Sequence, residues 1–146
     1  MYRSACALVN FLNHFGDRWS LIIIRDMFFQ KKTFNDFLTS PERIASNILT
    51  NRLKTLNKDG LIDYKINPEN KKVKWYFLTK KAVDLYPIIL EMVSWSSRNL
   101  NKKFGPQSTK WIKENNGAPK EVVAKNKAAE YLKFRDDLFN KSLTHS

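Results

Sequence analysis

The sequence is poor in the residues from which many enzyme and metal sites are built. Its 146 residues include one cysteine (Cys6), two histidines (His14 and His145) and only four glycines. A single cysteine excludes an internal disulfide and fits a reducing compartment. With so few His and Cys residues, neither a zinc triad nor a Cys–His nucleophile pair is assembled, and no glycine-rich loop is present to hold phosphates. We therefore expect a protein that is not an enzyme and that needs no cofactor.

Long hydrophobic runs are also missing. The longest apolar run, residues 21–24, is far shorter than the roughly 20 residues that cross a bilayer. The N-terminus has no basic stretch leading into an apolar one, so a secretory signal is not evident. These absences predict a cytoplasmic protein with no membrane partner.

Acidic residues are few beside basic ones: 14 Asp and Glu against 26 Lys and Arg give a net charge of +12. The excess is uneven, because residues 31–80 carry +6 and residues 101–146 carry +5, while residues 81–100 are neutral and apolar. Such a balance favours a polyanionic partner, either nucleic acid or an anionic membrane surface. A generally basic surface that serves solubility is the alternative.

What the sequence does have is a core: 42% of its residues are hydrophobic and 13% aromatic. Apolar spacing predicts a helix over residues 5–15 and a buried helix over 19–29, with Asp17 as its cap. Thr33 and Asp36 form a capping-box pattern for a short helix that the Ser40-Pro41 step ends. A further helix is expected over residues 46–58, with Ser46 as N-cap and Gly60 as its stop.

This helix over residues 46–58 has two contrasting faces. At about 100° per residue, Leu49, Leu53 and Leu56 fall on one stripe. The opposite face carries amides and amines, namely Asn47, Asn51, Lys54 and Lys58. The pattern predicts a helix that buries its leucines and offers the polar face to a partner.

Residues 61–66 and 73–78 read as two strands of a hairpin, joined by a polar turn over residues 67–72 that ends in Lys71 and Lys72. A long helix is expected from Thr79 to Leu100 with Pro87 inside it, then a short helix over 107–115 and a last one from Pro119 to about 139. The predicted fold class is mainly α with a small β-hairpin wing. It comprises a winged helix-turn-helix domain with dimerisation helices (1–100) and a basic C-terminal helical extension (101–146).

The order of three helices, hairpin and helix has a functional meaning. A polar helix fits the major groove, where amides suit adenine and lysines suit guanine or phosphate, and the wing (about 66–73) would lie on the minor groove or backbone. Arg52, on the flank, could reach a phosphate or pair with an acid such as Asp36. The candidate DNA-binding residues are Ser46, Asn47, Thr50, Asn51, Arg52, Lys54, Lys58, Lys71 and Lys72. The alternative is a winged-helix module for non-specific nucleic-acid binding or protein contact.

Several motifs resemble those of HxlR-type regulators, which are winged helix-turn-helix relatives of the MarR group. Residues 16–26 are similar to the signature Gly-Gly-Lys-Trp-Thr-x-Leu-Ile-Leu-Arg, residues 34–37 to Phe-x-Glu-Leu, and residues 44–56 and 76–79 follow in order. The chain departs from the pattern at Asp17 (usually Gly), Ala7 (usually Pro) and Trp75 (usually Glu). The resemblance implies a bacterial or archaeal transcriptional regulator, a homodimer that binds a pseudo-palindromic operator in double-stranded DNA.

The same resemblance implies a dimer held by the N-terminal helix and by the helix after the wing. The expected interface residues are Leu8, Val9, Leu12, Tyr86, Ile89, Val93 and Trp95. For the last four, packing within their own subunit is the alternative. Cys6 is a candidate redox sensor, with a structural or neutral role as the alternative. A cavity between the wing, the buried helix and the dimer helices could hold an unidentified small-molecule effector.

Overall fold

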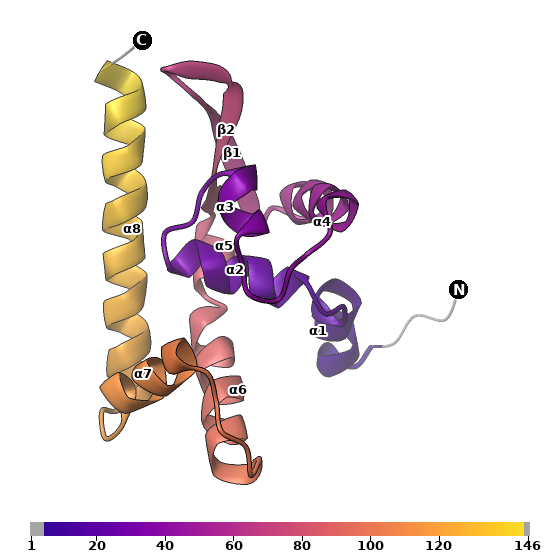
Figure 1. The fold of residues 1–146 in the computed structure, drawn as a ribbon, viewed down its shortest axis with the longest axis vertical. Coiled ribbons are helices and arrows are strands. Elements are labelled where there is room, and N and C mark those ends of the chain that lie inside the picture. Colours follow the sequence, from indigo (N-terminus) through magenta and orange to yellow (C-terminus); the bar gives the residue numbers. More distant parts are fainter. Residues whose placement is uncertain (1–4, 145–146) are drawn as a thin grey trace.

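The computed structural model describes residues 5–144, with side chains to residue 138; His145 lies outside this range. The described chain is mainly helical and includes one two-stranded antiparallel hairpin, which agrees with the predicted fold class (Figure 1). Its elements are α1 (Ala7–Phe15), α2 (Ser20–Phe28), α3 (Phe34–Leu38), α4 (Ser46–Lys58), β1 (Ile62–Asn67), β2 (Asn70–Leu78), α5 (Lys80–Val83), α6 (Tyr86–Asn99), α7 (Pro106–Asn115) and α8 (Lys120–Thr144). None of the described helices is long and apolar enough to cross a membrane.

Helix α2 lies at the centre of the fold, as its apolar composition predicts. The Asp17 carboxylate caps it by accepting hydrogen bonds from the backbone N–H groups of Trp19 and Ser20, both at 2.9 Å. Four of its apolar side chains are at most 2% exposed and form the middle of the core: Ile23, Ile24, Met27 and Phe28. The capping hydrogen bonds from Asp17 and the burial are present as predicted, although Trp19 holds the N-cap position itself.

Helices α3 and α4 form the helix-turn-helix unit. The capping box of Thr33 and Asp36 is present at the start of α3. Helix α4 spans the predicted residues and buries Leu49, Leu53 and Leu56 to 3% exposure or less. The prediction of Ser46 as N-cap is wrong: Ala45 holds the extended N-cap conformation without a side-chain hydrogen bond, and Ser46 is the first helical residue.

The hairpin is longer and its turn tighter than predicted. Ile62 pairs with Leu78 at the base, and Asn67 pairs with Asn70 at the tip, so only Pro68 and Glu69 form the turn. The side chain of Asn67 accepts the backbone N–H of Glu69 at 2.9 Å, which closes the turn early. Lys71 and Lys72 therefore lie within β2 and not in the turn.

The predicted long helix over residues 79–100 is two helices. Helix α5 ends at Val83, and α6 begins at Tyr86. Pro87 lies in the first turn of α6, where its missing N–H leaves no hydrogen bond unmade, so the chain breaks before the proline and does not kink at it.

The C-terminal segment packs against the same core. Helix α8 runs beside the hairpin (Figure 1), and its Tyr131, 2% exposed, accepts a hydrogen bond from the backbone N–H of Leu78 at 2.7 Å. On α7, the indole of Trp111 donates to the hydroxyl of Tyr86 at 3.0 Å. The hydrophobic core continues past residue 100 into α8.

Candidate nucleic-acid interface

The outer face of α4 is open to solvent over its whole length. Asn47, Asn51, Lys54 and Lys58 are all exposed, while the leucines on the other side are buried. At about 100° per residue these four side chains form one stripe along the helix. Near the N-terminus of α4, Ser46 is exposed, and the hydroxyl of Thr50 donates to the Ser46 carbonyl at 2.9 Å.

Arg52 fixes the amide of Asn51. Its Nη2 donates to Asn51 Oδ1 at 2.5 Å, and its Nη1 lies 3.7 Å from Asp17 Oδ1. Since a guanidinium only donates, the amide oxygen of Asn51 must face it, and this sets which way the amide points. The suggested pairing of Arg52 with Asp36 is not made in the structure, because Asp36 accepts the backbone N–H groups of Lys32 and Thr33 instead.

Asp17 is thus shared between the cap of α2 and the arginine of α4. Burial opposes ionisation of its carboxyl, but the hydrogen bonds from Ser20 and Trp19 outweigh this, and together with the charge of Arg52 they lower the pKa of Asp17. The carboxylate remains ionised at neutral pH and holds Arg52 in place.

A second ion cluster ties α2 to the loop before α4. Arg25 Nη2 lies 2.8 Å from Asp26 Oδ1 and 2.5 Å from Glu42 Oε1. The hydroxyl of Ser40 donates to the other oxygen of Asp26. The hydrogen bond from Arg25 lowers the pKa of Glu42. These partners are separated from Arg25 by up to 17 positions along the chain and fix the approach to α4, and no local sequence pattern points to them.

The wing lysines divide between the two faces of the hairpin. Successive strand residues point to opposite faces, so Lys72 shares a face with Lys74, whereas Lys71 points to the other side. Lys74, with Tyr64 and Tyr76, lines a cleft of about 330 Å³ against α4. Its Nζ lies 4.5 Å from the centre of the Tyr64 ring. Lys74 was not among the predicted DNA-binding residues. Side chains two residues apart in a strand share a face, so a predicted strand that included Lys72 would have placed Lys74 beside it.

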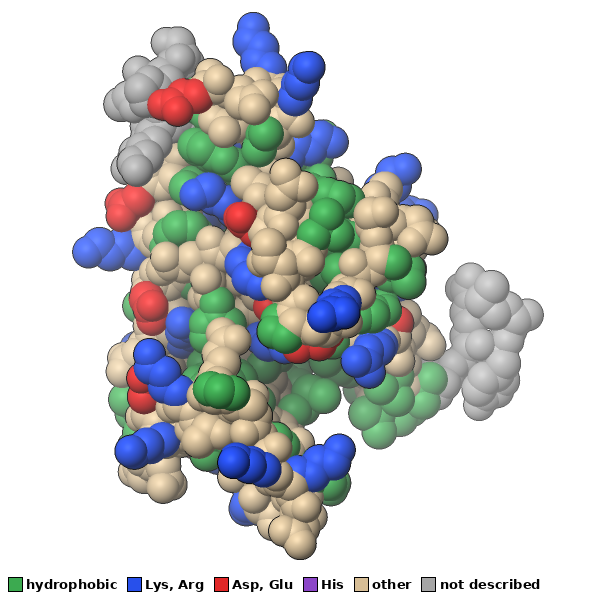
Figure 2. Space-filling view, viewed as in Figure 1, with side chains coloured by type: hydrophobic (Ala, Val, Ile, Leu, Met, Phe, Trp, Pro, Cys, Tyr) green, Lys and Arg blue, Asp and Glu red, His purple; other side chains and the backbone are tan. Residues whose placement is uncertain are grey.

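Basic side chains surround this region. In Figure 2 the upper end of the molecule, where the hairpin lies, presents several Lys and Arg side chains and fewer acidic ones. The cleft and the stripe on α4 are therefore both in a positive environment, which suits a polyanion.

The side chains expected at a dimer interface fall into two groups. Tyr86 and Ile89 are 3% and 6% exposed and belong to the subunit's own core, and the Tyr86 ring lies 4.9 Å from that of Phe28. Val93 is half-buried. The others are exposed, together with two α6 residues that sequence reasoning did not select: Leu8, Val9, Leu12, Ile88, Met92 and Trp95.

Cys6 is exposed at the N-cap of α1. Its carbonyl accepts the backbone and side-chain N–H groups of Asn10 at 3.1 and 2.8 Å. Within the described residues, no group of three His, Cys, Asp or Glu side chains is placed to hold a metal ion.

Comparison with known proteins gives a consistent picture. The profile of the HxlR-like helix-turn-helix family matches residues 14–104. The HTH-type transcriptional regulator YdeP of Bacillus subtilis is 29% identical over 93 residues, which cover 64% of this chain and 73% of that protein. The relatives reported by these comparisons are transcriptional regulators and not enzymes.

Two solved structures share the fold. The redox regulator HypR in its oxidized form is 30% identical with a TM-score of 0.59, covering 66% of this chain and 100% of that one. The reduced form of the transcriptional regulator YodB from B. subtilis, at 24% identity and a TM-score of 0.56, covers 69% and 100% and supports the fold alone.

Proposed function

Because the chain belongs to the HxlR-like helix-turn-helix family of transcriptional regulators, we propose that it is a homodimeric, sequence-specific regulator that binds double-stranded DNA. The observation that carries this proposal is the outer face of α4, where two amides and two lysines stand exposed above three buried leucines. A helix of this kind fits the major groove of B-DNA.

In the proposed complex α4 enters the major groove. Asn47 and Asn51 donate to and accept from base edges, adenine being the base that an amide matches best. Lys54 and Lys58 bind phosphates or guanine, and Ser46 and Thr50 lie where the helix N-terminus meets the backbone. In the wing, Lys72 and Lys74 lie on the face toward α4 and are the proposed phosphate contacts, with Lys71 on the outer side.

The proposed dimer uses the exposed apolar faces of α1 and α6. Leu8 and Leu12 on α1 are 65% and 50% exposed, and Met92 and Trp95 on α6 are 52% and 53% exposed. Large apolar side chains gathered in this way mark protein interfaces. A two-fold dimer would place two copies of α4 about one helical turn of DNA apart, roughly 34 Å, on a pseudo-palindromic operator.

Selection of bound duplexes from a random DNA pool tests this function. We expect enrichment of a two-fold symmetric sequence, and binding to it should resist competition by random DNA. Equal competition by random DNA would favour the second candidate, a winged-helix module that binds nucleic acid non-specifically. The basic residues along α8 are the observation that supports this second candidate.

Cys6 is the proposed redox-responsive position, because it is exposed at the start of α1, one of the two proposed dimer helices. The similarity to HypR, a redox regulator, agrees with this proposal. An oxidant should then change DNA binding by the wild type and leave binding by Cys6→Ser unchanged. Identical responses of the two proteins would assign Cys6 a neutral role.

A further inference from the structure

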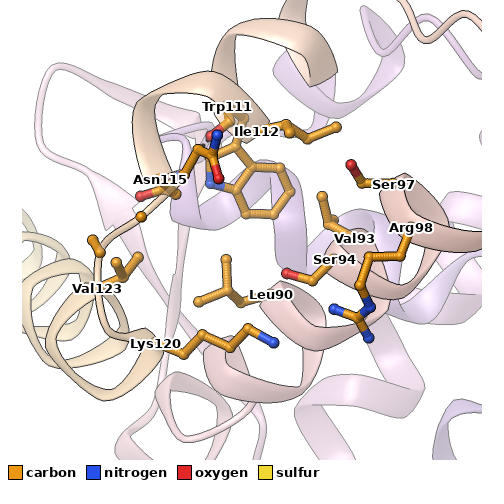
Figure 3. Close-up of a pocket in the computed structure, with 13 residues that line it drawn as sticks. Leu90, Val93, Ser94, Ser97, Arg98, Trp111, Ile112, Asn115, Lys120 and Val123 are labelled. Carbon is orange, nitrogen blue, oxygen red and sulfur yellow. Dashed lines mark hydrogen bonds between the residues drawn. The ribbon is translucent and has the colours of Figure 1, made fainter.

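A cavity of about 240 Å³ opens between α6, α7 and α8, at the end of the molecule away from α4 and the hairpin (Figures 1 and 3). Its wall is apolar on one side: Leu90 and Val93 come from α6, and the indole of Trp111 comes from α7. Trp111 is held there by its hydrogen bond to Tyr86, which is itself buried. The wall is therefore preformed.

The opposite side of the cavity is basic. Figure 3 shows the charged ends of Arg98 and Lys120 on the same side, across from the indole, with the hydroxyl of Ser94 between the two chains. Lys120 Nζ pairs with Glu91 Oε1 at 2.6 Å, so one acid faces these two cations. Within the described residues the guanidinium of Arg98 forms no ion pair or hydrogen bond. Because α8 begins at Lys120, the positive end of its dipole adds to this charge.

We propose that this cavity binds a small organic carboxylate with an apolar body. The apolar body would lie against Trp111, Leu90 and Val93, and the carboxylate would bind Arg98, Lys120 and Ser94. The volume is below the range of about 300–1,000 Å³ that is typical of sites for drug-sized ligands, so the apolar body is limited to a single ring or a short chain.

The site lies partly outside the region that matches the family, and part of it faces away from the proposed dimer stripe. The family match ends at residue 104, and α7 and α8 both lie beyond it. On α6, a rotation of about 100° per residue puts Leu90 and Ser94 about 100–160° from Ile88 and Trp95, whereas Arg98, three residues after Trp95, lies only about 60° from it. A dimer formed through the exposed stripe therefore leaves the Leu90 and Ser94 wall of the cavity uncovered, with Arg98 at the edge between the two faces.

A bound carboxylate would also act on the wing, through α8. This helix carries Lys120 at the cavity, and farther along it Tyr131 and Arg135 both contact the backbone of Leu78 at the base of the wing, at 2.7 and 3.4 Å. The ligand would thus regulate DNA affinity, and this part of the proposal rests on the proposed function.

Binding is tested on the full chain without DNA, with benzoate as the carboxylate and benzyl alcohol as its uncharged match. In a ¹H–¹⁵N titration, benzoate should shift the amide signals of residues 94–98, 115–118 and 120. Benzyl alcohol should bind at least about tenfold more weakly, since it lacks the charge-assisted hydrogen bonds. Arg98→Ala should weaken benzoate binding about tenfold.

Arg18→Ala is the matched control, because Arg18 is an exposed arginine stacked on Trp19 outside the cavity, 5.2 Å from the ring centre. It removes the same charge and should leave benzoate binding unchanged. The proposal is overturned if benzoate does not bind, if benzyl alcohol binds as tightly, or if both arginine variants bind benzoate equally well.

Saturating benzoate should change the DNA affinity of the wild type and not that of Arg98→Ala. If benzoate binds but the DNA affinity of the wild type does not change, only the proposed regulation is overturned and the binding site stands. This result is independent of whether the protein binds DNA as proposed.

Discussion

At the residue scale, the orientation of Asn51 depends on Arg52, which lies between it and Asp17. A lysine at position 52 keeps the charge but has no planar pair of nitrogens to bind the amide oxygen and the carboxylate together. Replacing Arg52 with lysine therefore tests the geometry of these hydrogen bonds separately from the charge.

We expect Arg52→Lys to keep most of the general affinity for DNA and to relax base preference at the position that Asn51 contacts. Arg52→Ala should reduce both, and its overall affinity should fall by several-fold because one cation is lost. Fluorescence anisotropy with the selected operator and its single-base variants measures both effects. Unchanged base preference in Arg52→Lys would show that Arg52 does not position the amide.

Much of the residue scale could be predicted from the sequence, because it depends on local pattern. The Asp17 cap, the Thr33–Asp36 capping box and the leucine face of α4 all follow from spacings of three or four residues. Partners distant in the chain could not be predicted. Neither the pairing of Arg25 with Glu42 nor that of Arg52 with Asp17 has a signal in the local pattern.

At the element scale, α8 stabilises the wing. The Tyr131 hydroxyl accepts the N–H of Leu78, and burial raises the pKa of Tyr131 to about 12 in spite of that hydrogen bond. The neutral hydroxyl therefore contributes stability that is fully present below its ordinary pKa of about 10 and is lost as the pH rises toward 12.

Tyr131→Phe should lower the free energy of unfolding by about 1–3 kcal/mol, because the N–H of Leu78 is left without its acceptor in a buried site. Tyr64→Phe, at a tyrosine 39% exposed, is the matched control and should cost less than about 0.5 kcal/mol. Urea unfolding followed by circular dichroism measures both variants. Equal stability of the two would mean that α8 does not hold the hairpin.

Element boundaries were predictable where a turn or cap residue marks them, and less so elsewhere. Helix α4 has its predicted bounds, whereas β2 begins three residues earlier than expected. The reason is that Asn67 closes the turn before the lysines, which a polar composition over residues 67–72 does not reveal. The division between α5 and α6 was not predicted. A proline is compatible both with a kink inside one helix and with the first turn of a second helix, and the sequence does not distinguish the two.

At the scale of the whole molecule, acid should destabilise the fold. The pKa values of Asp17, Asp36 and Glu42 are all lowered in the folded protein, through hydrogen bonds and nearby cations. Their contribution is present above the unfolded pKa of about 4 and is lost as the pH falls through the lower folded values. Thermal unfolding should therefore show a falling Tm below about pH 4.5, and a constant Tm down to pH 3 would contradict this.

The oligomeric state is a second property of the whole molecule. Trp95→Asp places a charge in the exposed apolar stripe of α6 and should shift the protein from dimer to monomer. Lys102→Asp, an exposed lysine beyond the end of α6, is a control that should remain dimeric. Sedimentation equilibrium distinguishes the two states, and a monomeric wild type would refute the proposed assembly.

Sequence alone did not separate the buried Tyr86 and Ile89 from the exposed Ile88 and Met92, because all four are apolar and close together on one helix.

The proposed function depends on the polar face of α4, which we propose reads base pairs in duplex DNA. The most direct measurement compares wild type, Asn51→Ala and Lys72→Ala on the selected operator and on all its single-base variants, at several salt concentrations. We predict that Asn51→Ala loses discrimination at one base pair of each half-site, worth about 1–3 kcal/mol. Lys72→Ala should weaken binding to every sequence alike. It should also make the slope of log affinity against log salt concentration less steep by about one for each lost phosphate contact. If both variants lower affinity uniformly for all sequences, α4 does not read bases and the account is wrong.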